Sequence, residues 1–111
     1  MNDLIRPSMY EAYHQIIAVN QNNRELKPYD VVGPVCETGD TFAKARKVHQ
    51  SNSGDLIAIM SSGAYGAVMS SSYNTRMLTP EVMVKGSEFA IIRNRPSYEE
   101  LIKQDIKPSW L

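Results

Sequence analysis

The stretch Gly-Pro-Val-Cys-Glu-Thr-Gly-Asp, residues 33–40, holds the only cysteine of this 111-residue chain, next to a carboxylate and between turn-forming glycines. Cysteine is usually buried and chemically inert. Because Cys36 lies beside Glu37, Gly39 and Asp40, we expect it at a junction between a strand and a loop, where side chains meet ligands. The alternative is a small apolar plug at the end of a strand, and this stretch alone leaves both interpretations open.

The composition of the whole chain limits the class of protein. A chain of 111 residues forms one domain with a modest core. Its 12 basic and 12 acidic residues form no basic stripe or acidic tail, which argues against nucleic acid or an anionic membrane as a partner. One cysteine cannot form an internal disulfide, and no apolar run approaches the roughly 18 residues of a membrane span. With no signal-peptide pattern at residues 1–6, the sequence predicts a cytoplasmic location.

The pattern of apolar residues predicts a chain built mainly of strands. Short runs rich in Val and Ile alternate with turn residues, which is typical of β-structure. The expected strands are residues 12–19, 29–35, 56–60, 81–84 and 88–92. The continuous apolar run at residues 56–60 is expected to be covered on both faces, and residues 85–87 predict a hairpin turn between the last two strands. A turn is expected at residues 20–23, and Pro34 places the second strand at a sheet edge or marks its end.

Two short helices are expected among the strands. Residues 64–73 are rich in small side chains and follow a glycine-containing turn. A second helix over residues 98–103 follows Ser97, and Ser97 with Glu100 forms a capping-box pattern. The predicted fold class is therefore mainly β, a β-rich α+β domain with a few short helices.

The first cluster with chemical potential is the segment that contains Arg6 and Tyr10. Pro7 and Ser8 predict a turn into a short helix, on which Arg6 and Tyr10, four residues apart, share one face. An arginine fork and a phenol donor together suit a carboxylate ligand. The alternative is a surface arginine stacked on a tyrosine.

The second cluster is the pair formed by Cys36 and Glu37. Glu37 could bind an ammonium group, and a thiol, which is mostly protonated at neutral pH, could act as a general acid. The alternative for Glu37 is a solvated loop carboxylate. His14 is expected within a strand and His49 in a polar loop. Neither has the spaced Cys, His or carboxylate partners of a metal site, so no metal ligand is expected.

The third cluster is Gly-Ala-Tyr-Gly at residues 63–66, at the start of the first expected helix. Glycine lets the backbone approach a ligand closely, and a helix N-terminus favours phosphate. Tyr65 could donate a hydrogen bond to a phosphate oxygen. The alternative is a plain turn.

Taken together and in order, these clusters resemble a known family. The matching segments are residues 6–10, 33–40, 63–66, 73–74, 80–82 and 95–101. They resemble the C-terminal region of the diaminopimelate decarboxylases, pyridoxal-phosphate enzymes of the alanine-racemase-like fold type (fold type III). The resemblance covers nearly the whole chain and implies a β-sandwich or barrel-like C-terminal sheet domain over residues 1–111.

The resemblance implies that part of the enzyme lies outside this chain. Family members carry a (β/α)₈ barrel N-terminal to this region, and that barrel holds the Schiff-base lysine and most of the phosphate-binding loop. None of the six lysines here matches the Schiff-base position, and residues 1–3 resemble an internal stretch of the family. We therefore expect a fragment or split-gene product that is inactive alone. Its expected partners are the barrel and a second subunit, as a homodimer.

The resemblance also implies roles for the matching residues. Cys36 would be the catalytic proton donor, acting across a dimer interface on the partner's cofactor. Arg6 and Tyr10 would bind the distal carboxylate of the substrate, and Glu37 its distal ammonium group. Tyr65 would contact the substrate and the phosphate of the cofactor, pyridoxal 5'-phosphate. The implied reaction converts meso-2,6-diaminopimelate to L-lysine and carbon dioxide.

Two other functions stay open at the level of the sequence. The chain could be a non-catalytic β domain, or a module that docks on a separately encoded barrel. It could also belong to a related decarboxylase that acts on ornithine, arginine or carboxynorspermidine. Those enzymes commonly have Asp after the cysteine, so Glu37 favours diaminopimelate.

Overall fold

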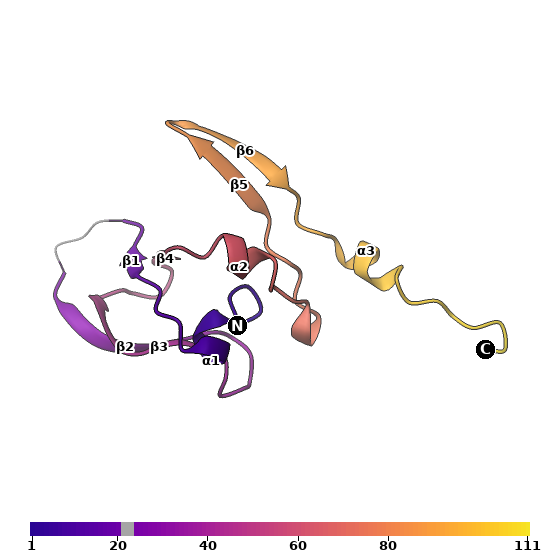
Figure 1. Cartoon of the computed structure of the whole chain (residues 1–111), viewed down its shortest axis with the longest axis horizontal. Helices are drawn as coiled ribbons and strands as arrows, with labels where there is room; N and C mark the ends of the chain where they lie inside the picture. Colours follow the sequence, from indigo (N-terminus) through magenta and orange to yellow (C-terminus); the bar gives the residue numbers. More distant parts are fainter. Residues whose placement is uncertain (21–23) are drawn as a thin grey trace. The chain divides into compact units, whose positions relative to one another are not determined.

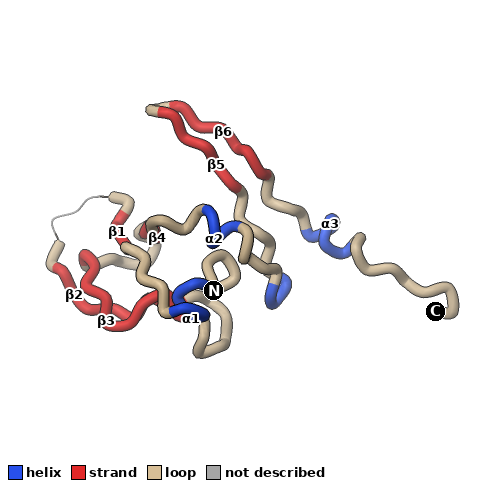
Figure 2. The backbone as a smooth tube through the Cα atoms, viewed as in Figure 1, coloured by secondary structure: helices blue, strands red, loops and turns tan. Residues whose placement is uncertain are grey.

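The computed structural model describes residues 1–20 and 24–111, which form two compact units. The first unit contains Met1 and Asp3–Ser70, and the second contains Asn2 and Ser71–Leu111. The elements, in chain order, are α1 (Arg6–Tyr10), β1 (Ile16–Ala18), β2 (Leu26–Val32), β3 (Thr41–His49), β4 (Ile57–Ile59), α2 (Ala64–Ala67), the 3₁₀ turn η1 (Tyr73–Thr75), β5 (Glu81–Lys85), β6 (Glu88–Arg93) and α3 (Tyr98–Ile102) (Figure 1). Strands outweigh the short helices (Figure 2), so the prediction of a mainly β fold is confirmed.

Two antiparallel strand pairs make up the first unit. β1 pairs with β4, with Ile16 opposite Ile59, and β2 pairs with β3, with Tyr29 opposite Arg46. The buried hydrophobic side chains of this small core are Leu4, Ile16 and Ala43. None of the helices in the described part of the chain is long and apolar enough to cross a membrane.

The residue pattern does not predict strand β3, and it places His49 in a polar loop. That placement is wrong, because His49 ends β3 and pairs with Leu26. The strand carries several charged side chains, including Lys44 and Arg46, and these obscure the period-2 pattern that identifies a half-buried strand. Pairing with β2 and the burial of Ala43 stabilise the strand instead.

A bulge in the β2–β3 ladder involves Ala45, which has a left-handed backbone with φ of 47°. Two residues, Lys44 and Ala45, stand opposite the single residue Asp30, so the register shifts here. The N–H of Ala45 donates to Oδ1 of Asp30 at 2.7 Å. This contact gives the bulge a bonded partner and keeps an L-residue in a conformation that favours glycine.

Three expected elements have different bounds in the structure. The strand expected at residues 12–19 is reduced to β1, the part that pairs with β4. The strand expected at residues 29–35 begins earlier, at Leu26, and ends at Val32, so Pro34 lies in the loop that follows the strand. The helix expected at residues 64–73 ends at Ala67, because the run of serines that follows favours turns over helix.

The apolar run at residues 56–60 is not covered on both faces, which corrects the prediction for this segment. Leu56 is 65% exposed and Ile57 is 43% exposed. The physical reason is that β4 has only β1 as a sheet partner within the described residues. The turn expected at residues 20–23 falls largely on residues 21–23, which lie outside the described residues.

The second unit contains the predicted hairpin and the predicted C-terminal helix. β5 and β6 pair antiparallel around a tight turn in which Gly86 has a φ of 61°. At the start of α3, the Ser97 hydroxyl accepts from the Glu100 N–H at 3.1 Å, and the Ser97 N–H donates to the Glu100 carboxylate at 2.7 Å. Both elements were predictable because their signals are local.

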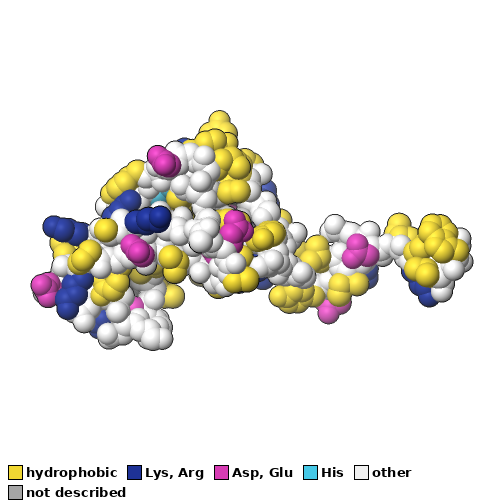
Figure 3. All heavy atoms as spheres, turned by 90° about the horizontal axis from the view of Figure 1, so that it is seen from below, with side chains coloured by type: hydrophobic (Ala, Val, Ile, Leu, Met, Phe, Trp, Pro, Cys, Tyr) yellow, Lys and Arg dark blue, Asp and Glu magenta, His cyan; other side chains and the backbone are white. Residues whose placement is uncertain are grey.

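Apolar side chains of the second unit are largely exposed. Neighbouring residues on β5 point to opposite faces of the hairpin, yet Met83 is 60% exposed and Val84 is 68% exposed. Figure 3 also shows hydrophobic side chains gathered at the C-terminal end of the chain, where Trp110 is 81% exposed. The described hairpin therefore lacks a core of its own.

We predict that Ala45→Gly stabilises the first unit. A left-handed backbone costs an L-residue roughly 1–2 kcal/mol, and glycine avoids this cost. Glycine also makes the unfolded chain more flexible, which offsets part of the gain. We therefore expect the free energy of unfolding to rise by about 0.5–1 kcal/mol. Urea denaturation of the chain measures the free energy of unfolding. Ala43→Gly is the matched control, because Ala43 lies buried in the same strand without a positive φ and should lose stability. A loss of stability in Ala45→Gly would contradict the left-handed bulge.

Candidate functional site

Helix α1 presents the first pair of predicted site residues. Pro7 lies in its first turn, where a missing N–H costs nothing, and Glu11 ends the helix with a φ of 54°. Tyr10 is 60% exposed, and Arg6 is half-buried. The structure thus bears out the short helix, and both side chains lie on a single five-residue segment.

The loop that follows β2 presents Cys36 and Glu37 to solvent. Both side chains are exposed, so Cys36 is not an apolar plug. The loop backbone is internally bonded: the Glu37 N–H donates to the Val35 carbonyl at 2.8 Å, and the Asp40 N–H donates to the Glu37 carbonyl at 3.0 Å. The thiol and carboxylate therefore stand on a folded loop.

Gly39 allows the Glu37 carboxylate to lie close to the loop backbone. A Cβ at Gly39 would stand 2.9 Å from Oε1 of Glu37, closer than real contacts allow. Any side chain at this position would push the Glu37 carboxylate aside. Because the exposed Glu37 side chain is flexible, that shift would cost little, and Gly39 is not strictly required here.

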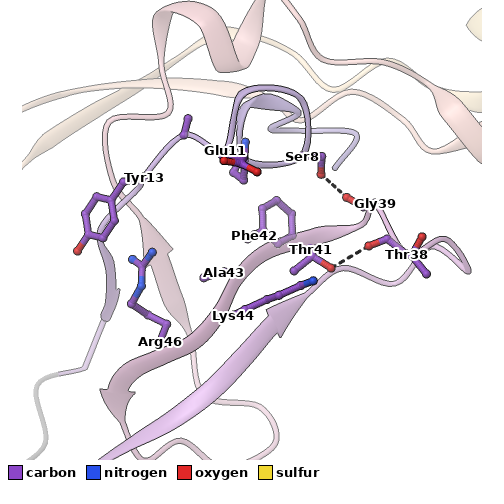
Figure 4. Close-up of a pocket in the computed structure, with 12 residues that line it drawn as sticks. Ser8, Glu11, Tyr13, Thr38, Gly39, Thr41, Phe42, Ala43, Lys44 and Arg46 are labelled. Atoms are coloured by element: carbon purple, nitrogen blue, oxygen red, sulfur yellow. Dashed lines mark hydrogen bonds between the residues drawn. The ribbon is translucent and has the colours of Figure 1, made fainter.

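A single side-chain hydrogen bond joins α1 to this loop. The hydroxyl of Ser8 donates to the carbonyl of Gly39, as the dashed line in Figure 4 shows. Ser8 lies between Arg6 and Tyr10, and Gly39 lies two residues beyond Glu37. The structure therefore brings the segments of the first two predicted clusters together.

The third predicted cluster lies on α2, where Tyr65 is 66% exposed. Gly66 is buried against Leu4, and a Cβ there would stand 3.3 Å from Leu4 Cδ1. The glycine thus lets α2 pack closely on the segment before α1 and leaves the neighbouring phenol outside. Because α2 has only four residues, the helix is too short to bind phosphate at its N-terminus. Tyr65 is therefore the side chain through which this cluster could contact a ligand.

A cleft of about 430 Å³ lies beside these segments, between α1 and β3. Ser8, Gly39 and five residues of strand β3 are among the residues that line it, as Figure 4 shows. The five predicted site residues are not among its lining residues. The cleft therefore adjoins the loop of Cys36 without containing the thiol.

Sequence reasoning missed the cationic wall of this cleft. Arg46 stacks on the Tyr13 ring, with 4.1 Å from the guanidinium carbon to the ring centroid, and donates to the His14 carbonyl at 2.8 Å. Lys44 lines the same cleft. Recognising β3 as a strand would have pointed to Lys44 and Arg46, two residues apart, as neighbours on one face, although the bulge at Ala45 interrupts the regular alternation between them.

Both histidines have structural contacts in this unit. His14 is buried just before β1, and its Nδ1 lies 2.9 Å from the Met60 carbonyl, whereas His49 Nδ1 lies 2.7 Å from the Arg24 carbonyl. Over the residues that the structure describes, no group of three His, Cys, Asp or Glu side chains could hold a metal ion. The expectation that His14 lies within a strand is wrong, since β1 begins at Ile16.

Comparison with known families identifies the class of the chain. Residues 1–63 match the family described as pyridoxal-dependent decarboxylase, C-terminal sheet domain, and the chain belongs to this family. The match includes α1 and the Cys36 loop but ends before α2.

Comparison with individual proteins is more specific. The chain is 52% identical over 111 residues to diaminopimelate decarboxylase of Zymomonas mobilis, covering 100% of this chain and 26% of that protein. It is 47% identical to diaminopimelate decarboxylase of Archaeoglobus fulgidus, covering 99% of this chain and 26% of that protein. The chain therefore spans about a quarter of the length of the curated relatives it matches.

Solved structures give the same result. Diaminopimelate decarboxylase from M. jannaschii, in co-complex with L-lysine, superposes with a TM-score of 0.91 at 40% identity, covering 100% of this chain and 25% of that chain. A structure of AQ1208 from Aquifex aeolicus superposes with a TM-score of 0.90 at 45% identity, covering 94% of this chain and 26% of that chain. The resemblance that the sequence suggested is thus confirmed.

We predict that Ser8→Ala loosens α1 from the Cys36 loop. Losing one hydrogen bond whose acceptor can turn to water costs about 1 kcal/mol of unfolding free energy. The Asp40 amide, which lies within the attached loop, should exchange its hydrogen faster. Denaturation and amide exchange of the chain measure the two effects. Ser51→Ala is the control, since its hydroxyl bonds only two residues back, to His49. Unchanged exchange at Asp40 would show that Ser8 does not hold the loop.

Proposed function

We propose that this chain is the C-terminal sheet domain of a diaminopimelate decarboxylase and that it contributes residues to a shared active site. The intact enzyme would decarboxylate meso-2,6-diaminopimelate to L-lysine and carbon dioxide. The observation that carries the proposal is the pairing of an exposed Cys36–Glu37 loop with α1, through the hydrogen bond from Ser8 to Gly39. A cytoplasmic location, suggested by the lone cysteine, is part of the proposal.

The charges of the site suit a substrate with an amino acid group at each end. The distal group of diaminopimelate is not consumed, so it needs a partner for its carboxylate and a partner for its ammonium. Arg6 and Tyr10 would donate to the carboxylate, and Glu37 would accept from the ammonium. Within the described residues, neither the Arg6 guanidinium nor the Glu37 carboxylate has an ion-pair partner, which leaves both available.

Cys36 would supply the proton that replaces the departing carboxylate. The reacting carbon needs a donor that is protonated at neutral pH and can reach it from one side. The Cys36 thiol is exposed, and the bonded loop backbone limits the directions in which it can point. An exposed thiol in an ordered loop fits a general acid that acts on a substrate held by another surface.

The cofactor of the proposed reaction is pyridoxal 5'-phosphate, consistent with the pyridoxal-dependent family to which the chain belongs. The chemistry it supplies when bound is the storage of the electron pair released as carbon dioxide leaves. Tyr65 would donate to its phosphate and contact the substrate. The residues present fit this contact with the phosphate. The Tyr65 phenol is exposed, and a Cβ at nearby Gly63 would meet nothing within 4 Å, so a ligand could approach Tyr65 freely.

The rest of the site would come from outside residues 1–111. We propose that a (β/α)₈ barrel supplies the lysine that holds the cofactor, and that a second subunit places Cys36 opposite its partner's cofactor. The structure of the M. jannaschii relative contains L-lysine, the product of the proposed reaction, which supports the choice of substrate.

The first test is decarboxylation of meso-diaminopimelate with added pyridoxal phosphate. We expect no activity from the chain alone and activity after mixing with a separately expressed barrel. Ornithine, arginine and carboxynorspermidine serve as control substrates and should react poorly, because they lack a distal carboxylate for Arg6. No activity in the mixture, with the barrel shown to be folded, would favour a non-catalytic domain. Preference for a control substrate would assign a related decarboxylase.

The second test is Cys36→Ala in the active mixture. Removing a general acid typically costs 10²- to 10⁴-fold, so kcat should fall by at least about 100-fold while KM changes little. Cys36→Ser retains a proton on a smaller atom and should recover part of the rate. Ser53→Ala, in an exposed turn, is the neutral control. An unchanged kcat in Cys36→Ala would exclude the thiol as proton donor.

A further inference from the structure

Asp40 carries the most deeply buried charged side chain of the described residues, at 2% exposure. A carboxylate removed from water is costly unless its oxygens are bonded. Here Oδ2 accepts from the Val35 N–H at 2.7 Å, and Oδ1 pairs with the ammonium group of Met1. The carboxylate thus reaches back along the chain and bonds the residue directly before Cys36.

The backbone of Asp40 closes the same loop a second time. The Gly33 N–H donates to the Asp40 carbonyl at 2.8 Å, and the Asp40 N–H donates to the Glu37 carbonyl at 3.0 Å. Asp40, at the end of residues 33–40, therefore bonds to Gly33, Val35 and Glu37. Cys36 and Glu37 lie inside the span that these bonds enclose, and both are exposed.

Gly33 is an independent sign that the position of this carboxylate is specific. A Cβ at Gly33 would overlap the carboxyl carbon and both oxygens of Asp40. Gly33 does not have a positive φ, so the backbone conformation does not require glycine. The absence of a side chain at Gly33 is needed only because the Asp40 carboxylate occupies that space.

We propose that Asp40 is a positioning residue for the decarboxylation: its buried carboxylate holds the Val35 amide and thereby orients the Cys36 thiol and the Glu37 carboxylate. This inference rests on the proposed function for its catalytic part. Asp40 touches neither substrate nor cofactor and acts through the loop. The hydrogen bond from the Val35 N–H to Oδ2 of Asp40 is the contact through which the carboxylate positions the loop.

The test compares Asp40→Ala with Asp40→Asn, which keeps an oxygen that can accept from the Val35 N–H. In the chain alone, we expect Asp40→Ala to speed amide exchange at Val35 by at least about tenfold, the equivalent of one net hydrogen bond, and Asp40→Asn to retain most of the protection. In the active mixture, kcat should fall by about tenfold or more for Asp40→Ala and stay within about threefold for Asp40→Asn.

Gly33→Ala reaches the same contact by a different route. It keeps the carboxylate but displaces it, so it should also expose the Val35 amide and lower kcat. This variant keeps the proposal testable if Asp40→Ala does not fold. Asp55→Ala is the matched control, because the Asp55 carboxylate also accepts a nearby backbone N–H, from Asn52 at 2.8 Å, in an exposed turn away from Cys36. That hydrogen bond, followed by the Arg24 guanidinium, holds the pKa of Asp55 below its ordinary value.

A double-mutant cycle separates positioning from a general loss of structure. If Asp40 acts through the thiol, Asp40→Ala should have little further effect on kcat once Cys36 has been changed to alanine. Asp55→Ala should act equally in both backgrounds. The proposal would be overturned if the effects of Asp40→Ala and Cys36→Ala on kcat were fully additive. It would also be overturned if the Val35 amide stayed protected from exchange in Asp40→Ala, or lost its protection equally in Asp40→Asn. If wild type is inactive, the proposed function fails, while amide exchange still tests the loop contact.

Discussion

The buried carboxylate of Asp40 is the constraint on which the candidate site depends. An ionised group can stay in the interior only if its oxygens find donors, so the loop must fold back and bring the Val35 N–H to it. The bonds from Gly33, Val35 and the loop itself to Asp40 close residues 33–40, and Cys36, Glu37 and Thr38 within this loop are exposed. The buried carboxylate and the exposed thiol thus belong to the same closed loop.

Helix α1 adds the second half of this arrangement. A five-residue helix is too short to be stable by itself, so its placement depends on tertiary contacts such as the bond from Ser8 to Gly39. The side chains that carry the proposed chemistry, Tyr10, Cys36, Glu37 and Tyr65, are all exposed. Groups that face outward can enclose a substrate only together with another surface. The proposed function requires such a surface, because it takes the rest of the site from outside this chain.

Local signals were sufficient for several elements. Proline in the first turn predicted α1, a glycine turn predicted the β5–β6 hairpin, and the Ser97–Glu100 pair predicted the start of α3. Strand β3 was missed because its charged side chains hide its alternation, and its identity depends on pairing with β2. The cationic wall of the cleft, Lys44 and Arg46, was lost with it. The residue pattern also overestimated the burial of β4, because periodicity does not reveal how many partner strands a segment has.

The sequence by itself determined the family, since residue types in a given order need no coordinates to be recognised, and it supplied the residues of the proposed site. It also determined the mainly β character of the chain, because turn residues and apolar alternation are local properties. Only the tertiary structure decided that Cys36 is exposed and that Asp40 is buried behind it. The reason is physical: burial and hydrogen bonding depend on which distant groups converge, and residues as far apart as Ser8 and Gly39 meet only after the chain has folded.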